Sequence, residues 1–220
     1  MRSVFKKFIK IIAIYFLLVT SVTAEKLMVF DFTEEELNSL EVRKVRGADA
    51  KTLYSIGNNE NGSYLKAVAE NAASGVGKEI KINLDKTPFI NITWKIEKDL
   101  KGIKENTKKG HDFAARVFVI KKTGATPLSN RAINYVFSSN SNVGETWPSP
   151  YTKKSIDSVL ASTKSNLNEW VTVKANVKED FKKFHDLDVE ELSGIAIMAD
   201  TDNSKLTAVS YYQNIFFSSE

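Results

Sequence analysis

The chain has 220 residues, of which 42% are hydrophobic and 26% charged, a balance typical of globular rather than disordered or fibrous proteins. Its formal net charge is +4, but the first ten residues hold four basic residues and no acidic one, so the rest of the chain is neutral. Proteins that bind nucleic acid carry their excess positive charge on the folded domain. The composition therefore argues against nucleic acid as a partner.

Residues 1–24 have the pattern of a secretory signal peptide. A basic stretch ends at Lys10, the apolar run Ile11–Val19 follows, and Val22–Ala24 offers the small residues that a signal peptidase recognises. The apolar run is shorter than the roughly 20 residues that span a membrane. We therefore expect an exported, periplasmic or extracellular protein with no stable membrane span after cleavage. An uncleaved N-terminal anchor is the alternative.

Residues 25–220 are long enough to form a single domain with its own core. The chain contains no cysteine, which excludes disulfides, cysteine-ligated metals and thiol nucleophiles. Its stability must therefore come from packing.

Strand patterns dominate this domain. Phe89–Glu97 alternates strictly between apolar and polar residues, as a half-buried strand does, and Lys78–Leu84 alternates similarly. Asp112–Lys121 and Gly194–Asp200 are apolar on both faces, which predicts central positions between two layers. Further strands are expected at Met28–Phe32, Thr52–Ile56, Ser63–Ala69, Arg131–Ser138, Ser155–Ala161, Trp170–Ala175 and Thr207–Phe217. The sequence predicts an all-β fold, a two-layer antiparallel β-sandwich that is jelly-roll-like, with one or two short helices.

Both expected helices begin with a capping pattern. Asn176 can cap a helix that starts at Val177, and Thr33 can cap a short helix that ends near Leu40. The first of these has an apolar stripe at helical spacing, formed by Val177, Phe181 and Phe184. Irregular segments are expected at Gly57–Gly62, Lys98–His111 and Ser139–Lys154.

Several short strings occur in a specific order along the chain. They are Leu65-Lys66-Ala67, Lys78-Glu79-Ile80, Thr87-Pro88, Trp94-Lys95, Asp112-Phe113-Ala114-Ala115-Arg116-Val117, Asn134-Tyr135-Val136, Trp147-Pro148-Ser149-Pro150-Tyr151, Ile197-Met198-Ala199-Asp200-Thr201-Asp202-Asn203 and Tyr211-Tyr212-Gln213-Asn214-Ile215. Together they resemble the bacterial exported family called Domain of Unknown Function 3047, from about Val29 to Phe217. The resemblance implies a bacterial envelope location and a single domain, and no activity. Related sequences often have an acidic residue where Asn214 stands, so a cation held there would lack that charge.

A second similarity concerns architecture alone. The opening Phe30-Asp31-Phe32, the run of strands and the tyrosine-rich last strand look like jelly-roll carbohydrate-binding modules. Because one fold supports many functions, this similarity does not fix what the protein does.

Arg116 is the polar residue that most needs an explanation, because it lies in an apolar strand, and burying a guanidinium without a partner is costly. Strand alternation puts Asp112 on the same face, and Asn134 and Asp200 are polar positions on other apolar strands. One hypothesis is a polar ligand-binding floor made of these four residues. The simpler interpretation, an Arg–Asp pair that fixes sheet register, is favoured.

The segment Ser139–Lys154 carries Trp147 and Tyr151 among prolines. Exposed aromatic rings stack on sugars, but the segment could equally fold back and use them as a lid on the core. Tyr135, next to Asn134, is added to the candidate ligand-binding residues.

Asp200, Asp202 and Asn203 offer oxygen atoms at nearly alternate positions, as calcium loops do. Lys205 and Tyr211 stand where an EF-hand needs glycine and glutamate, so a polar turn is favoured over calcium, and a cation shared with Asp31 is a weak alternative. The chain has two histidines, without the spacing of a zinc site, and no metal or other cofactor is expected.

These observations predict an exported, non-catalytic binding module of the bacterial envelope. Its partner would be a glycan or another envelope component, placed against Trp147 and Tyr151 and contacted by Arg116, Asn134 and Asp200. One alternative is a hydrolase of envelope polysaccharide that uses Asp112 and Asp200. Another is a structural protein that docks a partner through an apolar patch or sheet edge.

Overall fold

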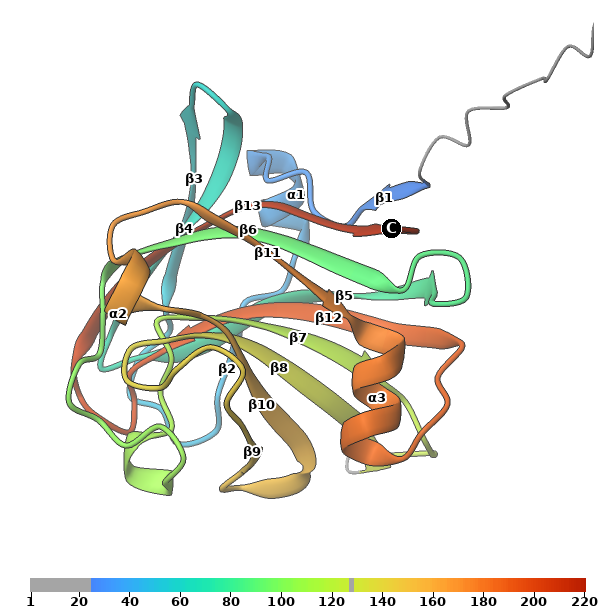
Figure 1. Cartoon of the computed structure of the whole chain (residues 1–220). Helices are drawn as coiled ribbons and strands as arrows, with labels where there is room; N and C mark the ends of the chain where they lie inside the picture. The colour runs from blue at the N-terminus through green and yellow to red at the C-terminus, as the bar shows by residue number, and fades with distance from the viewer. Residues whose placement is uncertain (1–24, 127–128) are drawn as a thin grey trace, which may run out of the picture.

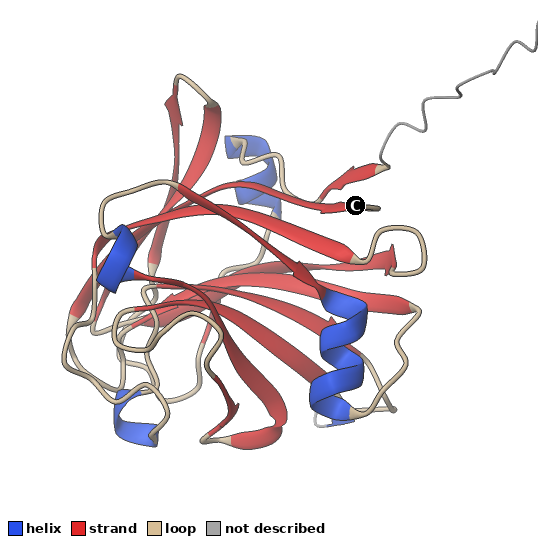
Figure 2. Cartoon of the chain, in the orientation of Figure 1, coloured by secondary structure: helices blue, strands red, loops and turns tan. Residues whose placement is uncertain are grey.

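The computed structural model describes residues 25–126 and 129–220, so the predicted signal peptide lies outside the described residues. Within them the strands form two sheets, which Figure 1 shows as two layers and Figure 2 shows to be the dominant structure. The upper, six-stranded sheet has the order β11-β6-β13-β4-β3, with β1 paired to β13. The lower, seven-stranded sheet has the order β2-β5-β12-β7-β8-β10-β9. This is the jelly-roll-like β-sandwich that the sequence predicts.

The bounds of the elements follow the predicted pattern closely. The six-stranded sheet contains β1 (Lys26–Met28), β3 (Leu53–Asn59), β4 (Gly62–Glu70), β6 (Phe89–Lys98), β11 (Val171–Asn176) and β13 (Thr207–Ser218). The seven-stranded sheet contains β2 (Arg43–Lys44), β5 (Ala73–Asn83), β7 (Ala115–Lys121), β8 (Arg131–Ser138), β9 (Thr146–Ser149), β10 (Thr152–Ser162) and β12 (Glu191–Asp200). The helices are α1 (Glu34–Ser39), α2 (Thr163–Asn166), α3 (Val177–His185) and the 3-10 helix η1 (Lys108–Gly110).

Several details differ from the sequence prediction. The short strands β2 and β9 and the helix η1 were not expected, and β9 lies inside the segment Ser139–Lys154 that was expected to be irregular. The first strand ends at Met28 rather than spanning Met28–Phe32, and β7 begins at Ala115 rather than Asp112. Gly57–Gly62 is a tight hairpin whose strands continue to its tip, and α2 was not expected. The sheets are also not wholly antiparallel, because β8 and β10 run parallel. The long segment between these two strands makes this possible, since parallel neighbours need a crossover connection.

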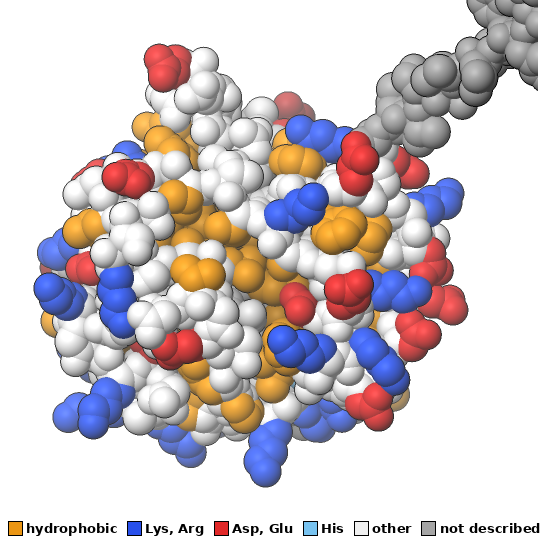
Figure 3. Space-filling model, in the orientation of Figure 1, with side chains coloured by type: hydrophobic (Ala, Val, Ile, Leu, Met, Phe, Trp, Pro, Cys, Tyr) orange, Lys and Arg blue, Asp and Glu red, His pale blue; other side chains and the backbone are white. Residues whose placement is uncertain are grey.

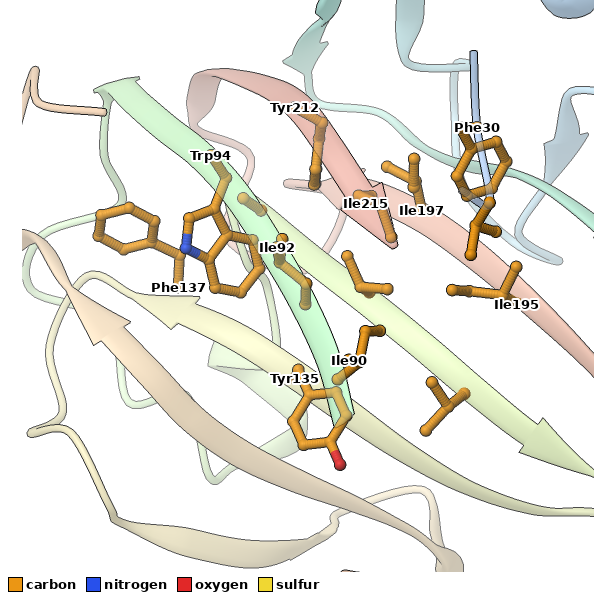
Figure 4. Close-up of a cluster of buried hydrophobic side chains, with 14 of the residues drawn as sticks. Phe30, Ile90, Ile92, Trp94, Tyr135, Phe137, Ile195, Ile197, Tyr212 and Ile215 are labelled. Atoms are coloured by element: carbon orange, nitrogen blue, oxygen red, sulfur yellow. The ribbon is translucent and has the colours of Figure 1, made fainter. Parts of the chain in front are cut away.

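The core lies between the two sheets. Strand alternation turns Ile90, Ile92 and Trp94 of β6 inward, where they meet Tyr135 and Phe137 of β8, and Figure 4 shows these side chains facing one another between the layers. All five are fully buried. The two strands that are apolar on both faces, β7 and β12, are adjacent in the middle of the seven-stranded sheet, as expected.

Helix α3 covers one end of the core. Val177 and Phe181 are fully buried and Phe184 packs beside them, which is the predicted stripe. In Figure 3, which views the side crossed by β11 and α3 in Figure 1, hydrophobic side chains gather toward the middle and charged ones toward the rim. No helix among the described residues is long and apolar enough to cross a membrane.

Replacing Asn176 by alanine should destabilise the fold by about 1 kcal/mol. The Asn176 side chain accepts a hydrogen bond from the Glu179 N–H, 3.2 Å away, which would otherwise lack a partner at the start of α3. Urea denaturation measures the change. The control is Asn176→Asp, which keeps the acceptor and should retain the stability; equal losses in both variants would contradict a capping role.

Candidate functional site

The polar residues predicted from the sequence gather on the outer face of the seven-stranded sheet. Because side chains alternate along a strand, Arg116 and Asn134 point away from the core while their neighbours Val117 and Ile133 point into it. They line a pocket of about 460 Å³. Its wall includes six of the predicted residues, Arg116, Asn134, Tyr151, Asp200, Asp202 and Asn203, together with His111, Phe118 and Met198.

Arg116 has the oxygen partner that its burial requires. Its Nη2 donates to Oδ2 of Asp200 at 2.5 Å, and the two side chains are 6% and 2% exposed. Phe113 and Phe118 flank the guanidinium, with ring centroids 5.3 and 5.1 Å from its central carbon. The favoured interpretation, a buried Arg–Asp pair between strands, therefore describes the geometry, and the same pair also lines the pocket.

Burial dominates the electrostatics of Asp200. It raises the pKa of this carboxyl from 3.8 to about 8, although Arg116 acts in the opposite direction, and the negative charges of Asp112 and Asp202 add to the rise. The pKa of Asp202 is also raised, first by burial and then by Asp112. Proton binding is therefore favoured in this part of the pocket.

We expect Asp200 to make the free energy of unfolding fall as the pH rises from about 4 to about 8. The unfolded chain loses this proton near pH 3.8, whereas the folded chain keeps it to about 8. In that window the folded state binds more protons, so a rise in pH favours unfolding. Between these pH values, the free energy of unfolding from denaturation curves should depend less on pH for Asp200→Asn than for the natural chain. An equal pH dependence in the two proteins would show that Asp200 is not the cause.

Asp112 differs from its predicted role. It precedes β7, is fully buried, and does not line the pocket. Its Oδ1 accepts from the backbone N–H and the Nδ2 of Asn203, and its Oδ2 accepts from the N–H of Ser204 at 2.6 Å. It therefore holds the turn between β12 and β13 rather than forming part of a strand face with Arg116.

Three carboxylates approach one another here, since Asp112, Asp200 and Asp202 each place an oxygen within 4.8 Å of the others. However, N–H groups already occupy both oxygens of Asp112, and Asp200 accepts from Phe113 and Arg116. Donors of this kind satisfy negative charge and compete with a cation for the same lone pairs. Asp31, the other suggested ligand, is not part of this cluster in the described ranges.

Sequence reasoning missed the other half of the pocket. His111 is 5% exposed, and its Nε2 lies 2.8 Å from Oδ2 of the fully buried Asp157 on β10. Asp157 also accepts from Nδ2 of Asn134 at 2.7 Å. The criterion that identified Arg116, a charged residue within a predicted strand, also applies to Asp157. Nothing in the sequence, however, indicates that Asp157 pairs with His111.

Two buried polar atoms of the site are unpartnered within residues 25–126 and 129–220. They are Nε of Arg116 and Oδ1 of Asn134, in side chains that are more than nine-tenths buried. Buried polar atoms in proteins nearly always have a protein or water partner. The polar wall is therefore incompletely satisfied by the protein itself.

The aromatic residues separate into different roles. Tyr151 is 56% exposed and borders the pocket, with its ring 5.5 Å from that of His111 and its hydroxyl 2.6 Å from Oδ1 of Asn203. Trp147 instead packs on a cluster formed by Phe113, Val136 and Val159. It therefore covers buried apolar residues, which was the alternative interpretation of this segment. Tyr135 lies in the core, where its hydroxyl donates to Asp180 of α3. Neither Trp147 nor Tyr135 lines the pocket.

Comparison with known proteins identifies the family. The model of the family described as "Protein of unknown function (DUF3047)" matches residues 38–216. The chain belongs to this family. No curated protein matches the chain.

Three solved structures resemble this DUF3047 chain at low identity. The family 11 carbohydrate-binding module of the cellulosomal cellulase Lic26A-Cel5E of Clostridium thermocellum is 12% identical, with 90% of this chain and 95% of that chain covered and a TM-score of 0.45. A meso-active, thermostable cellulase derived from Cel12A of Rhodothermus marinus is 9% identical, with coverages of 89% and 100% and a TM-score of 0.45. The xyloglucanase domain of NopAA from Sinorhizobium fredii is 10% identical, with coverages of 80% and 92% and a TM-score of 0.44.

Proposed function

We propose that this protein is an exported binding module of the bacterial envelope that holds a glycan in the pocket of the seven-stranded sheet and does not transform it. The observation that carries the proposal is a single pocket in which the polar side chains of Arg116, Asn134 and Asn203 lie beside the exposed ring of Tyr151. A sugar hydroxyl both donates and accepts hydrogen bonds, so neighbouring hydroxyls can pair with donors and acceptors of this wall alike.

The rest of the wall suits a sugar ring as well. Phe118, Met198 and Tyr151 provide apolar surface beside the polar atoms. A pyranose presents C–H groups on its faces and hydroxyls on its rim, so it needs both kinds of wall in one pocket. A volume of about 460 Å³ lies within the usual range of small-ligand sites.

Binding is favoured over catalysis because the carboxylates are poorly disposed for glycoside hydrolysis. That reaction needs two carboxyl groups facing the bond, one protonated and one ionised. Asp112 is fully buried, does not line the pocket, and has both oxygens occupied by N–H donors. The pKa values of Asp200 and Asp202 are both raised, which favours the protonated form in each.

A glycan array probed with the mature protein tests the proposal. We expect binding of one glycan class, and a loss of at least about tenfold in affinity for Asn134→Ala and for Tyr151→Ala. Leu53→Ala, at a 71% exposed residue of the other sheet, is the control and should bind normally. Circular dichroism confirms that each variant is folded. If no glycan on the array is bound, or if both pocket variants bind normally, the proposal is wrong.

One observation supports hydrolysis as a second candidate. Asp200, with a pKa near 8 in a pocket, has the protonation state of a general acid at neutral pH. Incubating the protein with bacterial envelope polysaccharide and measuring new reducing ends separates the two functions. Turnover that disappears in Asp200→Asn but not in Tyr151→Phe would establish the hydrolase; no turnover supports the binding module.

A further inference from the structure

The outer face of the six-stranded sheet, the upper layer in Figure 1, carries a row of alternating cationic and aromatic side chains. Strand register places Lys66 of β4, Tyr211 of β13 and Lys95 of β6 opposite one another. Trp170 immediately precedes β11 and completes the row beside Lys95. The ammonium group of Lys95 lies 4.3 Å from the ring centroid of Tyr211 and 5.5 Å from that of Trp170, and the ammonium of Lys66 lies 5.5 Å from Tyr211. We call these four residues the lysine–aromatic row.

A fifth side chain fixes the row in place. Tyr64 packs edge-on against Tyr211, with centroids 5.5 Å apart, and lies 6.0 Å from Trp170. Its ring covers Gly57 of the neighbouring strand so closely that a Cβ there would lie 2.5 Å from the ring. The rings therefore form a packed layer, with Tyr211 only 7% exposed and Trp170 and Tyr64 partly exposed.

Four lysines of this face form no ion pair within the described part of the chain. Lys66 and Lys95 form no ion pair there, and neither do Lys26 and Lys174, which lie over the rings of Phe216 and Phe89. Glu97, two positions along β6 from Lys95, accepts a hydrogen bond from the Tyr211 hydroxyl at 2.5 Å. Contact with the rings limits the motion of the ammonium groups, so less entropy is lost when they bind an anion.

We propose that the lysine–aromatic row is a second binding surface, separate from the pocket, whose partner is a linear acidic polysaccharide. The ammonium groups complement its carboxylates or sulfates, and the partly exposed rings of Trp170 and Tyr64 offer aromatic surface to its sugar rings. The hydroxyls of Thr93 and Thr172, paired at 2.8 Å on the same face, extend the polar surface. An anionic membrane would use the same lysines, but the rings of the row lie packed against one another rather than protruding from the sheet.

Affinity electrophoresis of the mature protein in gels containing polygalacturonate tests the surface, with dextran as the uncharged polymer. Polygalacturonate should retard the protein, dextran should not, and added salt should weaken the retardation. The double variant Lys66→Gln/Lys95→Gln should bind at least about tenfold more weakly, and Trp170→Ala should also bind more weakly. The charge-matched control Lys101→Gln/Lys104→Gln, at exposed residues outside the row, should lose little.

Several outcomes would overturn the proposal. Equal losses in the two double variants would show that net charge alone acts. Retention on phosphatidylglycerol vesicles without retention by polygalacturonate would assign the face to a membrane. Loss of polygalacturonate binding in Tyr151→Ala would place the polymer in the pocket instead. Normal binding by that variant would show that the row and the pocket are separate sites, and this conclusion does not depend on the result of the glycan array.

Discussion

Replacing Arg116 by methionine is expected to destabilise the fold by about 3 kcal/mol or more at alkaline pH, because it leaves the buried carboxylate of Asp200 without its cation. Methionine has nearly the same length, so it can fill the space between Phe113 and Phe118. The loss therefore reports the broken ion pair rather than a cavity. Guanidinium-induced unfolding measures the free energy directly.

The size of this loss should depend on pH in a defined direction. Arg116 lowers the pKa of Asp200, so its removal lets that pKa rise above its present value of about 8. Below that pH the carboxyl can hold a proton in both proteins, and the difference between them is smaller. Above it, only the natural chain keeps a stabilised carboxylate, and the difference grows.

An exposed pair provides the control. Arg43 pairs with Glu41 at 2.9 Å, but their side chains are 80% and 72% exposed. Solvent screens such a pair, so Arg43→Met should change stability little at any pH. A similar loss at both arginines, or a loss at Arg116 that does not grow with pH, would show that the Arg116–Asp200 pair is not the cause.

Local sequence patterns predicted the fold well because the forces behind them are local. The alternation of Phe89–Glu97 reflects the two faces of one strand, and the cap at Asn176 involves residues three positions apart. The parallel pairing of β8 with β10 has no such local sign. It depends on how the 139–151 segment returns the chain to the sheet, which is a property of the whole layer.

The sequence identified individual residues of the site but not which of them contact one another. Burial of Arg116 demanded an oxygen partner, and this requirement could be stated without knowing which acid supplies it. The acid on the expected face was Asp112, but the strand starts three residues later, so the alternation that placed Asp112 beside Arg116 does not reach it. His111 and Asp157 meet across 46 positions, and no spacing rule connects residues so far apart.

Truncating Asp112 to alanine should be the other strongly destabilising change, again with a loss of about 3 kcal/mol or more. The carboxylate is fully buried and accepts three hydrogen bonds from Asn203 and Ser204, so its removal leaves their donors without partners. Asp112→Asn should lose less, since its amide oxygen still accepts from Asn203. Thermal and urea denaturation of both variants give the order.

The same substitution separates the structural role of Asp112 from a catalytic one. Removing its charge should lower the pKa of Asp200 and of Asp202, because Asp112 raises both, and carboxyl chemical shifts measured by NMR across the pH range report this. Asp186→Asn, at an exposed carboxylate paired with Lys182, is the control and should leave both pKa values unchanged. If Asp112→Asn instead folds with natural stability, leaves both pKa values in place and abolishes turnover of a polysaccharide, Asp112 acts on a substrate, and its role in holding the β12–β13 turn is wrong.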